Sequence, residues 1–216
     1  MKKILGMVPI ACLTIGISAA QGAPLPDPVM DTPLAQSSGS SQITLAGGCF
    51  WGIQAVFQHT KGVKQATSGY AGGQAATAHY DMVSTGSTGH AESVQVTYDP
   101  SQVTLGQILK VYFSVAHNPT ELNHQGPDHG TQYRSAIFFA LPEQQKIAQA
   151  YIDQLQQAKV FSDPIVTKLE PLQGFYAAED YHQNYATLHP NNMYIVVNDA
   201  PKVRALESLY PQLYVK

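Results

Sequence analysis

The apolar positions near residue 50 change from a strand-like period to a helix-like one. Residues 41–46 have the pattern of a short β-strand and end in two glycines. Directly after, residues 52–58 place apolar side chains at the spacing of one helix face. We therefore predict a strand, a glycine turn and a helix, with Cys49 at the turn near the start of the helix.

Both periods recur along the rest of the chain, without strict β–α–β alternation. Further strands are expected at residues 63–70, 92–98, 135–140 and 165–169, and further helices at 105–113, 142–159, 177–188 and 203–209. Two polar loops separate them, at 75–89 (with a helical turn near 80–83) and at 118–134. A loop as long as the second is typical of a functional segment or a disordered one. The pattern predicts a single α+β domain over residues 42–216.

The first residues have the pattern of a secretory signal peptide. Lys2 and Lys3 precede an apolar run that ends in small residues, so cleavage after Ala20 or Ala23 is expected. A membrane anchor is the weaker interpretation, because the apolar run is short and contains proline and glycine. Lipidation at Cys12 is a further alternative, although the residues around Cys12 are a poor context for lipid attachment. Residues 1–23 are thus predicted to leave the protein, which would be periplasmic or secreted.

The segment that follows, residues 24–41, is rich in proline, serine and glycine. It has little apolar periodicity, which is typical of a flexible linker. The net charge of −3 becomes two charges more negative when Lys2 and Lys3 leave. An acidic chain without a basic run argues against nucleic acid as a partner.

Cys49 is expected to be the only cysteine of the processed chain. A single cysteine in an exported protein is either paired between molecules or a working thiol. The start of a helix lowers the pKa of a thiol, and Phe50 and Trp51 supply an apolar surface beside it. The alternative is a buried cysteine of an ordinary core, which is the usual fate of a free cysteine.

Glu92, at the start of a predicted strand, is the acid that we would pair with Cys49. A carboxyl group beside an apolar pocket has a raised pKa and can donate a proton near neutral pH; a solvated strand end is the alternative. Asp128 and Tyr133 lie in a second polar stretch, and Tyr80 lies in the first loop. The histidines lack the spacing of metal ligands, so no metal is expected.

Five motifs occur together in one order and resemble peptide methionine sulfoxide reductase, type A, over roughly residues 42–198. They are Gly47-Gly48-Cys49-Phe50-Trp51-Gly52, Gly69-Tyr70-Ala71-Gly72-Gly73, Gly89-His90-Ala91-Glu92, residues 125–135, and Ala178-Glu179-Asp180-Tyr181-His182-Gln183. Each motif alone would be weak, but five in register are specific. The resemblance implies reduction of methionine-S-sulfoxide, in proteins or free, and repair of oxidative damage through a cysteine sulfenic acid.

The resemblance also implies roles for individual residues. Cys49 matches the nucleophile that attacks the sulfoxide sulfur. Phe50 and Trp51 match the aromatic wall that holds the substrate methyl group. Glu92 matches the acid that protonates the sulfoxide oxygen.

The remaining site residues follow from the same resemblance. Tyr80 and Tyr133 match hydroxyl donors to the sulfoxide oxygen, and Asp128 matches an acid that positions water and the nucleophile. The implied fold is a two-layer α/β sandwich around a mixed sheet, and a monomer is expected.

Many relatives carry further cysteines that form a disulfide with the oxidised nucleophile, and the tail of this chain has none. We therefore expect no bound cofactor and an external thiol reductant, such as dithiothreitol or a thioredoxin-like dithiol. Two other functions stay open at this point. One is a Cys-His hydrolase that uses His90 or His182 as its base. The other is a non-catalytic module that binds methionine peptides.

Overall fold

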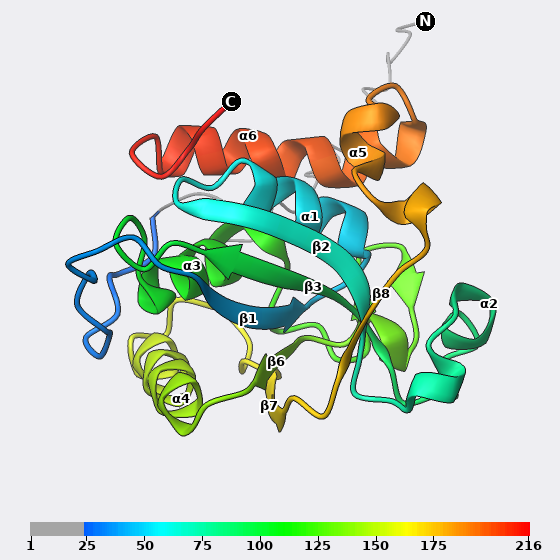
Figure 1. Ribbon diagram of the computed structural model, residues 1–216, viewed down its shortest axis with the longest axis horizontal. Helices are drawn as coiled ribbons and strands as arrows, with labels where there is room; N and C mark the ends of the chain where they lie inside the picture. Colours follow the sequence, from blue (N-terminus) through cyan, green and yellow to red (C-terminus); the bar gives the residue numbers. More distant parts are fainter. Residues whose placement is uncertain (1–23) are drawn as a thin grey trace, which may run out of the picture.

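A curled six-stranded sheet forms the centre of the protein in the computed structural model, which describes residues 24–216 (Figure 1). The strand order is β7-β6-β1-β3-β2-β8. The strands are β1 (Ser41–Ala46), β2 (Val63–Ala71), β3 (Ala91–Tyr98), β6 (Ala136–Phe139), β7 (Lys168–Pro171) and β8 (Phe175–Ala177). The β6–β7 pair is parallel and the other pairs are antiparallel, so the sheet is mixed. The expected α+β fold is confirmed. The predicted signal peptide lies outside the described residues.

Six α-helices surround the sheet in the described part of the chain. They are α1 (Phe50–Gln58), α2 (Tyr80–Val83), α3 (Leu105–Val111), α4 (Pro142–Gln157), α5 (Tyr185–Leu188) and α6 (Ala200–Leu209). Thr104 caps α3 through a reciprocal pair of hydrogen bonds with Gln107. A π-helical turn (Tyr112–Ala116) continues α3, and another (Ile195–Asp199) leads into α6. No helix within residues 24–216 is both long and apolar enough to cross a membrane.

The main core lies on the face of the sheet that the helices cover. Ile43 and Leu45 of β1 and Val94 and Val96 of β3 are buried there with side chains of α1, α3, α4 and α6. Their alternation follows from the two-residue period of a strand. Helix α6 lies beside α1 (Figure 1). These layers fix α1, and therefore Cys49, between β3 and α6.

Residues 24–40 differ from the flexible linker expected from their composition. Leu25 is buried, and its N–H donates to the Tyr210 hydroxyl at 2.8 Å. The carboxylate of Asp27 pairs with Lys110 at 2.7 Å, and that of Asp31 accepts the Gly106 N–H at 2.8 Å. These polar contacts to distant residues hold the segment in place. Because they do not require regularly spaced apolar residues, the apolar pattern of the segment did not predict them.

The stretch 177–188 is not the continuous helix that its spacing predicted. Residues 175–177 form β8, residues 180–182 a 3-10 turn, and only Tyr185–Leu188 is α-helical. Asn184 has φ 58°, which breaks the helix before α5. The Gln183 side chain bonds the backbone of β2 at Ser68 in both directions, at 3.0 and 2.9 Å. These contacts with β2 replace the hydrogen bonds of a helix.

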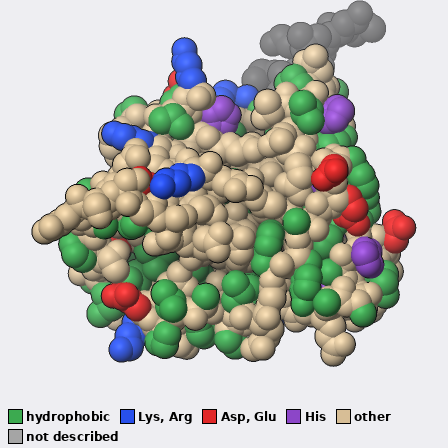
Figure 2. Space-filling view, viewed as in Figure 1, with side chains coloured by type: hydrophobic (Ala, Val, Ile, Leu, Met, Phe, Trp, Pro, Cys, Tyr) green, Lys and Arg blue, Asp and Glu red, His purple; other side chains and the backbone are tan. Residues whose placement is uncertain are grey.

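Two element boundaries and one loop also differ from the sequence prediction. The strand expected at 165–169 lies at Lys168–Pro171, and the last helix begins before residue 203. The long loop contains a two-stranded hairpin of β4 (His124–Gln125) and β5 (Asp128–His129). Figure 2 shows a face with few charged side chains, on which a group of acidic ones lies at the end that carries α2 and others lie toward the opposite end.

Candidate active site

Cys49 occupies the N-cap position of α1, immediately after β1. The turn before it needs glycine twice. Gly48 has φ +92°, and a Cβ atom on Gly47 would come within 2.6 Å of the His117 ring. The thiol is 8% exposed and is the one free cysteine of the described chain. The strand–turn–helix prediction is therefore confirmed around this residue.

Glu92 lies beside Cys49 because β3 is the neighbour of β1 in the sheet. Its side chain is 2% exposed, and one carboxyl oxygen accepts the N–H of Phe50 at 3.1 Å. Burial raises the pKa of Glu92 to about 8, against the lowering effect of that hydrogen bond. The carboxyl group is thus protonated at neutral pH, in a position to donate a proton next to the thiol.

The thiol itself differs from the expectation of a lowered pKa. Burial raises the pKa of Cys49 well above its usual value, and the negative charges of Glu92 and Asp199 add to the effect. A hydrogen bond from the backbone N–H of Trp51 and the charge of Lys202 both lower the pKa of Cys49. The helix start is present as predicted, but the loss of solvent outweighs it. The free protein therefore holds a thiol, beside a carboxyl group that is also protonated.

Trp51 forms the centre of an aromatic platform next to the thiol. Its ring stacks on Tyr185 with centroids 3.8 Å apart and meets the edge of Tyr194 at 5.9 Å. Its indole Nε1–H donates to Nδ1 of His182 at 3.2 Å. Phe50 packs against the same histidine, with ring centroids 5.0 Å apart. The two predicted wall residues thus share one apolar surface.

Tyr80 is held at the site by Glu179. One oxygen of that carboxylate accepts the Tyr80 backbone N–H at 2.9 Å, and the other accepts the Tyr70 hydroxyl at 2.8 Å. The Tyr80 ring packs against His182 with centroids 4.5 Å apart. Burial and then the charge of Glu92 raise the pKa of Tyr80, so its hydroxyl keeps its proton.

Tyr133 reaches the same place from the long loop. Its carbonyl oxygen accepts the N–H of Gly48 at 3.1 Å, next to Cys49 in sequence. Burial raises the pKa of Tyr133, and the charges of Glu92 and Asp128 act in the same direction. Tyr133 is thus a second protonated hydroxyl near the thiol and Glu92.

Asp128 lies on β5 and accepts a hydrogen bond from the hydroxyl of Tyr194. This contact joins the long loop to the π-helical turn before α6. Burial raises the pKa of Tyr194, and the next effect is the charge of Cys49, which places the tyrosine near the thiol. Sequence analysis missed Tyr194 and Tyr185. No motif distinguished them among the chain's 12 tyrosines.

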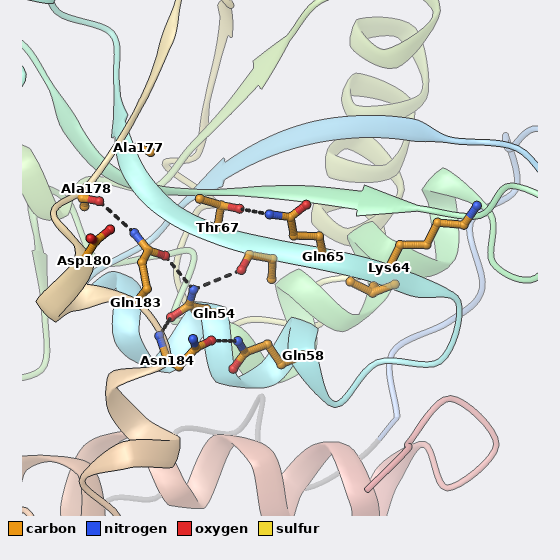
Figure 3. Close-up of a pocket in the computed structure, with 12 residues that line it drawn as sticks. Gln54, Gln58, Lys64, Gln65, Thr67, Ala177, Ala178, Asp180, Gln183 and Asn184 are labelled. Carbon is orange, nitrogen blue, oxygen red and sulfur yellow. Dashed lines mark hydrogen bonds between the residues drawn. The ribbon is translucent and has the colours of Figure 1, made fainter.

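A network of amide side chains joins α1, β2 and the segment before α5 (Figure 3). Gln54 of α1 donates to the Ala66 carbonyl of β2 and to the Gln183 side chain, both at 3.0 Å. The Asn184 N–H in turn donates to Gln54 at 2.8 Å. A surface pocket of about 450 Å³ lies over this network, and none of the candidate catalytic residues lines it. The network thus ties the chain just after His182 to α1 and β2.

His90 is engaged away from the thiol. Its Nδ1 accepts the Gly73 N–H at 3.2 Å, and its Nε2 lies 3.0 Å from the Gln74 carbonyl oxygen. Burial lowers the pKa of His182, whose Nδ1 already accepts from Trp51. Within residues 24–216, no group of three or more His, Cys, Asp or Glu side chains could hold a metal ion.

Comparison with known sequences gives a consistent result. The family described as peptide methionine sulfoxide reductase matches residues 41–212. A protein of Mesorhizobium japonicum named peptide methionine sulfoxide reductase MsrA 2 is 61% identical over 176 residues, which cover 82% of this chain and 90% of that protein. A protein of the same name from Synechocystis is 48% identical over 188 residues, covering 86% and 88%.

Solved structures agree with the sequences. The reduced form of Mxr1 from Saccharomyces cerevisiae has a TM-score of 0.64 at 32% identity, covering 76% of this chain and 92% of that one. Methionine sulfoxide reductase A of Corynebacterium diphtheriae has a TM-score of 0.61 at 37% identity, covering 79% and 85%. Family, fold and site lead to one assignment: this chain belongs to the peptide methionine sulfoxide reductase family, and it is a thiol-dependent oxidoreductase that reduces methionine sulfoxide.

Proposed function

We propose that Cys49 and Glu92 carry out the reduction of methionine-S-sulfoxide as nucleophile and proton donor. The observation that carries this proposal is the buried, protonated Glu92, which is bonded to the Phe50 N–H at 3.1 Å. Protein-bound and free methionine sulfoxide are both substrates in this account. The family assignment argues against the Cys-His hydrolase and the binding module.

The chemistry needs both groups at once. The sulfoxide oxygen leaves readily only when it is protonated, and the sulfoxide sulfur is attacked readily only by a thiolate. When Glu92 gives its proton to the oxygen, the thiol proton can pass to Glu92 as the Cys49 sulfur attacks. In the net change, the S–O bond of the substrate breaks and an S–O bond forms on Cys49. The substrate sulfur gains the two electrons that the thiol loses, which leaves methionine and a sulfenic acid.

The aromatic platform suits the apolar carbons of the substrate. Phe50 and Trp51 would contact the methyl group, and Tyr185 keeps the indole ring in place by stacking on it. The hydroxyls of Tyr80 and Tyr133 would donate to the sulfoxide oxygen. Asp128 would act indirectly, through water and through its bond with Tyr194.

Regeneration of Cys49 would use thiols from outside the chain. Residues 24–216 contain no second cysteine to condense with the sulfenic acid. One external thiol would therefore form a mixed disulfide with Cys49, and a second would release it. A dithiol, such as dithiothreitol or a thioredoxin-like protein of the same compartment, delivers both thiols in sequence.

Export is a separate proposal, which rests on Lys2, Lys3 and the apolar run after them. The processed protein would work in the periplasm or outside the cell. Its N-terminus, read by mass spectrometry on protein recovered from cells, should lie near residue 21 or 24. Intact Met1 on protein from the soluble cytosol would contradict export.

The function is tested by incubating the purified protein with each methionine sulfoxide epimer and dithiothreitol, and measuring methionine. Only the S epimer should be converted. A monothiol at equal thiol concentration should support slower turnover, because two separate encounters are needed. Equal conversion of both epimers would refute the assigned specificity.

A further inference from the structure

A buried ion pair lies against the first turn of α1, at Gly52. Asp199, the last residue of the π-helical turn, is fully buried, and one carboxylate oxygen lies 3.1 Å from Nζ of Lys202 in α6. The second oxygen has no hydrogen-bond partner within the described chain. The Lys202 side chain is 17% exposed. A charged pair this deep costs desolvation energy, so its position calls for a reason beyond stability.

The pair touches the helix that carries the nucleophile. Gly52 lies three residues after Cys49, in the first turn of α1. A Cβ atom there would clash with the Asp199 carboxylate and lie 2.8 Å from Nζ of Lys202. Glycine therefore lets both charges approach the backbone of this turn. Helix α6 lies along α1 and brings the pair to this point (Figure 1).

Several ionisable groups face the thiol from the elements packed around it. Glu92 comes from β3, Tyr80 from α2, Tyr133 from the long loop, and Tyr194, Asp199 and Lys202 from the C-terminal segment. Asp128 of β5 faces Glu92 and the tyrosines of this group. Lys202 is the cation among these groups. In a site that excludes water, a neighbouring charge acts far more strongly than it would in solvent.

We propose that the Asp199–Lys202 pair is a positioning device of the active site, in which Lys202 supports the thiolate of Cys49 and Asp199 holds Lys202 in place and moderates its charge. The inference rests on the proposed role of Cys49. It gives a function to a C-terminal helix whose residues carry none of the site motifs. It also explains why the first turn of α1 carries glycine at position 52.

The expected signs differ for the two members of the pair. Without Lys202, Cys49 loses its cation and faces an uncompensated Asp199, so its pKa should rise. Without the charge of Asp199, the charge of Lys202 acts on the thiol without opposition from Asp199, and the pKa of Cys49 should fall. These directions agree with the causes that act on Cys49 in the intact protein. A merely structural pair would give the same sign for both substitutions.

The test measures alkylation of Cys49 by iodoacetamide against pH in the full-length protein, read on the Cys49 peptide by mass spectrometry. Lys202→Met should slow alkylation at pH 7 by about tenfold, which corresponds to about one pKa unit. Lys202→Arg should restore the rate. Asp199→Asn should shift the pH profile downward. Arg204→Met, an exposed position of the same helix, is the matched control and should leave the profile unchanged.

An unshifted profile in Lys202→Met, or equal shifts in Lys202→Met and Lys202→Arg, would overturn the proposal. If Lys202→Met does not fold, Lys202→Gln carries the same prediction, because its amide can still bond Asp199. The readout needs no sulfoxide. A shifted profile in a protein that fails to reduce methionine sulfoxide would therefore refute the proposed function and keep this inference.

Discussion

The two ends of β3 carry buried carboxyl groups in opposite states. Glu92, at the start of the strand, receives one backbone hydrogen bond, and burial raises its pKa to about 8. Asp99, just after the strand, is 1% exposed but receives hydrogen bonds from Ser38, Gly39 and Ser101. The bonds from Ser38 and then Ser101 hold the pKa of Asp99 well below its usual range.

Loss of solvent is the largest effect at Glu92, whereas hydrogen bonds outweigh it at Asp99, and this balance decides which state each carboxyl group adopts. Asp99 stays ionised and fastens the N-terminal segment to the domain, with Lys64 3.7 Å away. Glu92 stays protonated and faces the thiol. The strand β3 is thus flanked by a structural anion at one end and carries a proton donor at the other.

The largest effect is expected at the nucleophile itself. Cys49→Ser should abolish methionine formation, because a serine hydroxyl does not attack sulfoxide sulfur at a useful rate. The change is nearly isosteric, so the circular dichroism spectrum and melting temperature should stay close to those of the wild type. Turnover above background in this variant would remove Cys49 from the mechanism.

Replacing the acid should come next in size. Glu92→Gln keeps the shape of the side chain but loses the proton, so the rate at neutral pH should fall by about 10² to 10⁴-fold. The loss should be smaller at low pH, where solvent can protonate the oxygen. The wild-type rate should itself decline as the pH rises past about 8, where Glu92 loses its proton.

Asp99→Asn is the matched control for this variant. It alters the carboxyl group at the other end of the same strand and should leave kcat/KM near the wild-type value. Comparable losses in Glu92→Gln and Asp99→Asn would show that the acid of β3 acts through the fold rather than through proton transfer.

Smaller effects are expected from the tyrosine hydroxyls. Tyr80→Phe and Tyr133→Phe each remove one donor to the sulfoxide oxygen, so each should lower kcat/KM by about tenfold. The double variant should lose more than either single one. Tyr176→Phe serves as a control, since that ring packs on His90 instead. Wild-type rates in both single variants would show that Glu92 alone donates to the sulfoxide oxygen.

The smallest effect concerns the free energy of unfolding. As the pH rises, the contribution of Glu92 to this free energy is lost, whereas the contribution of Asp99 is gained. The pKa of Glu92 is raised from 4.5, so its contribution is present below about pH 4.5 and is lost as the pH rises through about 8. The pKa of Asp99 is lowered from 3.8, so its contribution is present above that pH and is lost in acid.

Melting temperatures of the two variants test these signs. Relative to the wild type, Glu92→Gln should gain stability between pH 5 and pH 8.5. Asp99→Asn should melt a few degrees lower at pH 7, with a deficit that shrinks below pH 4. If the melting temperatures of the two variants changed with pH in the same direction relative to the wild type, the opposite states of Glu92 and Asp99 would be contradicted.

Local sequence signals predicted the parts of the site that local structure positions. The strand and double glycine before Cys49 and the start of α1 all depend on neighbouring residues. The motif around Glu92 gave its candidate role, while its protonation state depends on burial by distant elements. Sequence analysis therefore identified Glu92 as the acid, but its prediction of a lowered pKa for Cys49 was wrong.

Contacts across long sequence distances account for what was missed. Tyr185 and Tyr194 meet Trp51 only after β8 and α5 fold back on α1. The Asp199–Lys202 pair has the spacing of an ordinary ion pair on a helix surface, and only the fold places it against Gly52. The bonds of Gln183 to β2 likewise overrode the helical pattern of residues 177–188.

A single turnover without reductant tests the central claim most directly. The processed protein is mixed with excess methionine-S-sulfoxide, and both methionine and the intact protein mass are measured. The account predicts about one methionine per protein and a mass gain of about one oxygen, located on Cys49. Two methionines per protein, or a loss of two hydrogens through an internal disulfide, would contradict it.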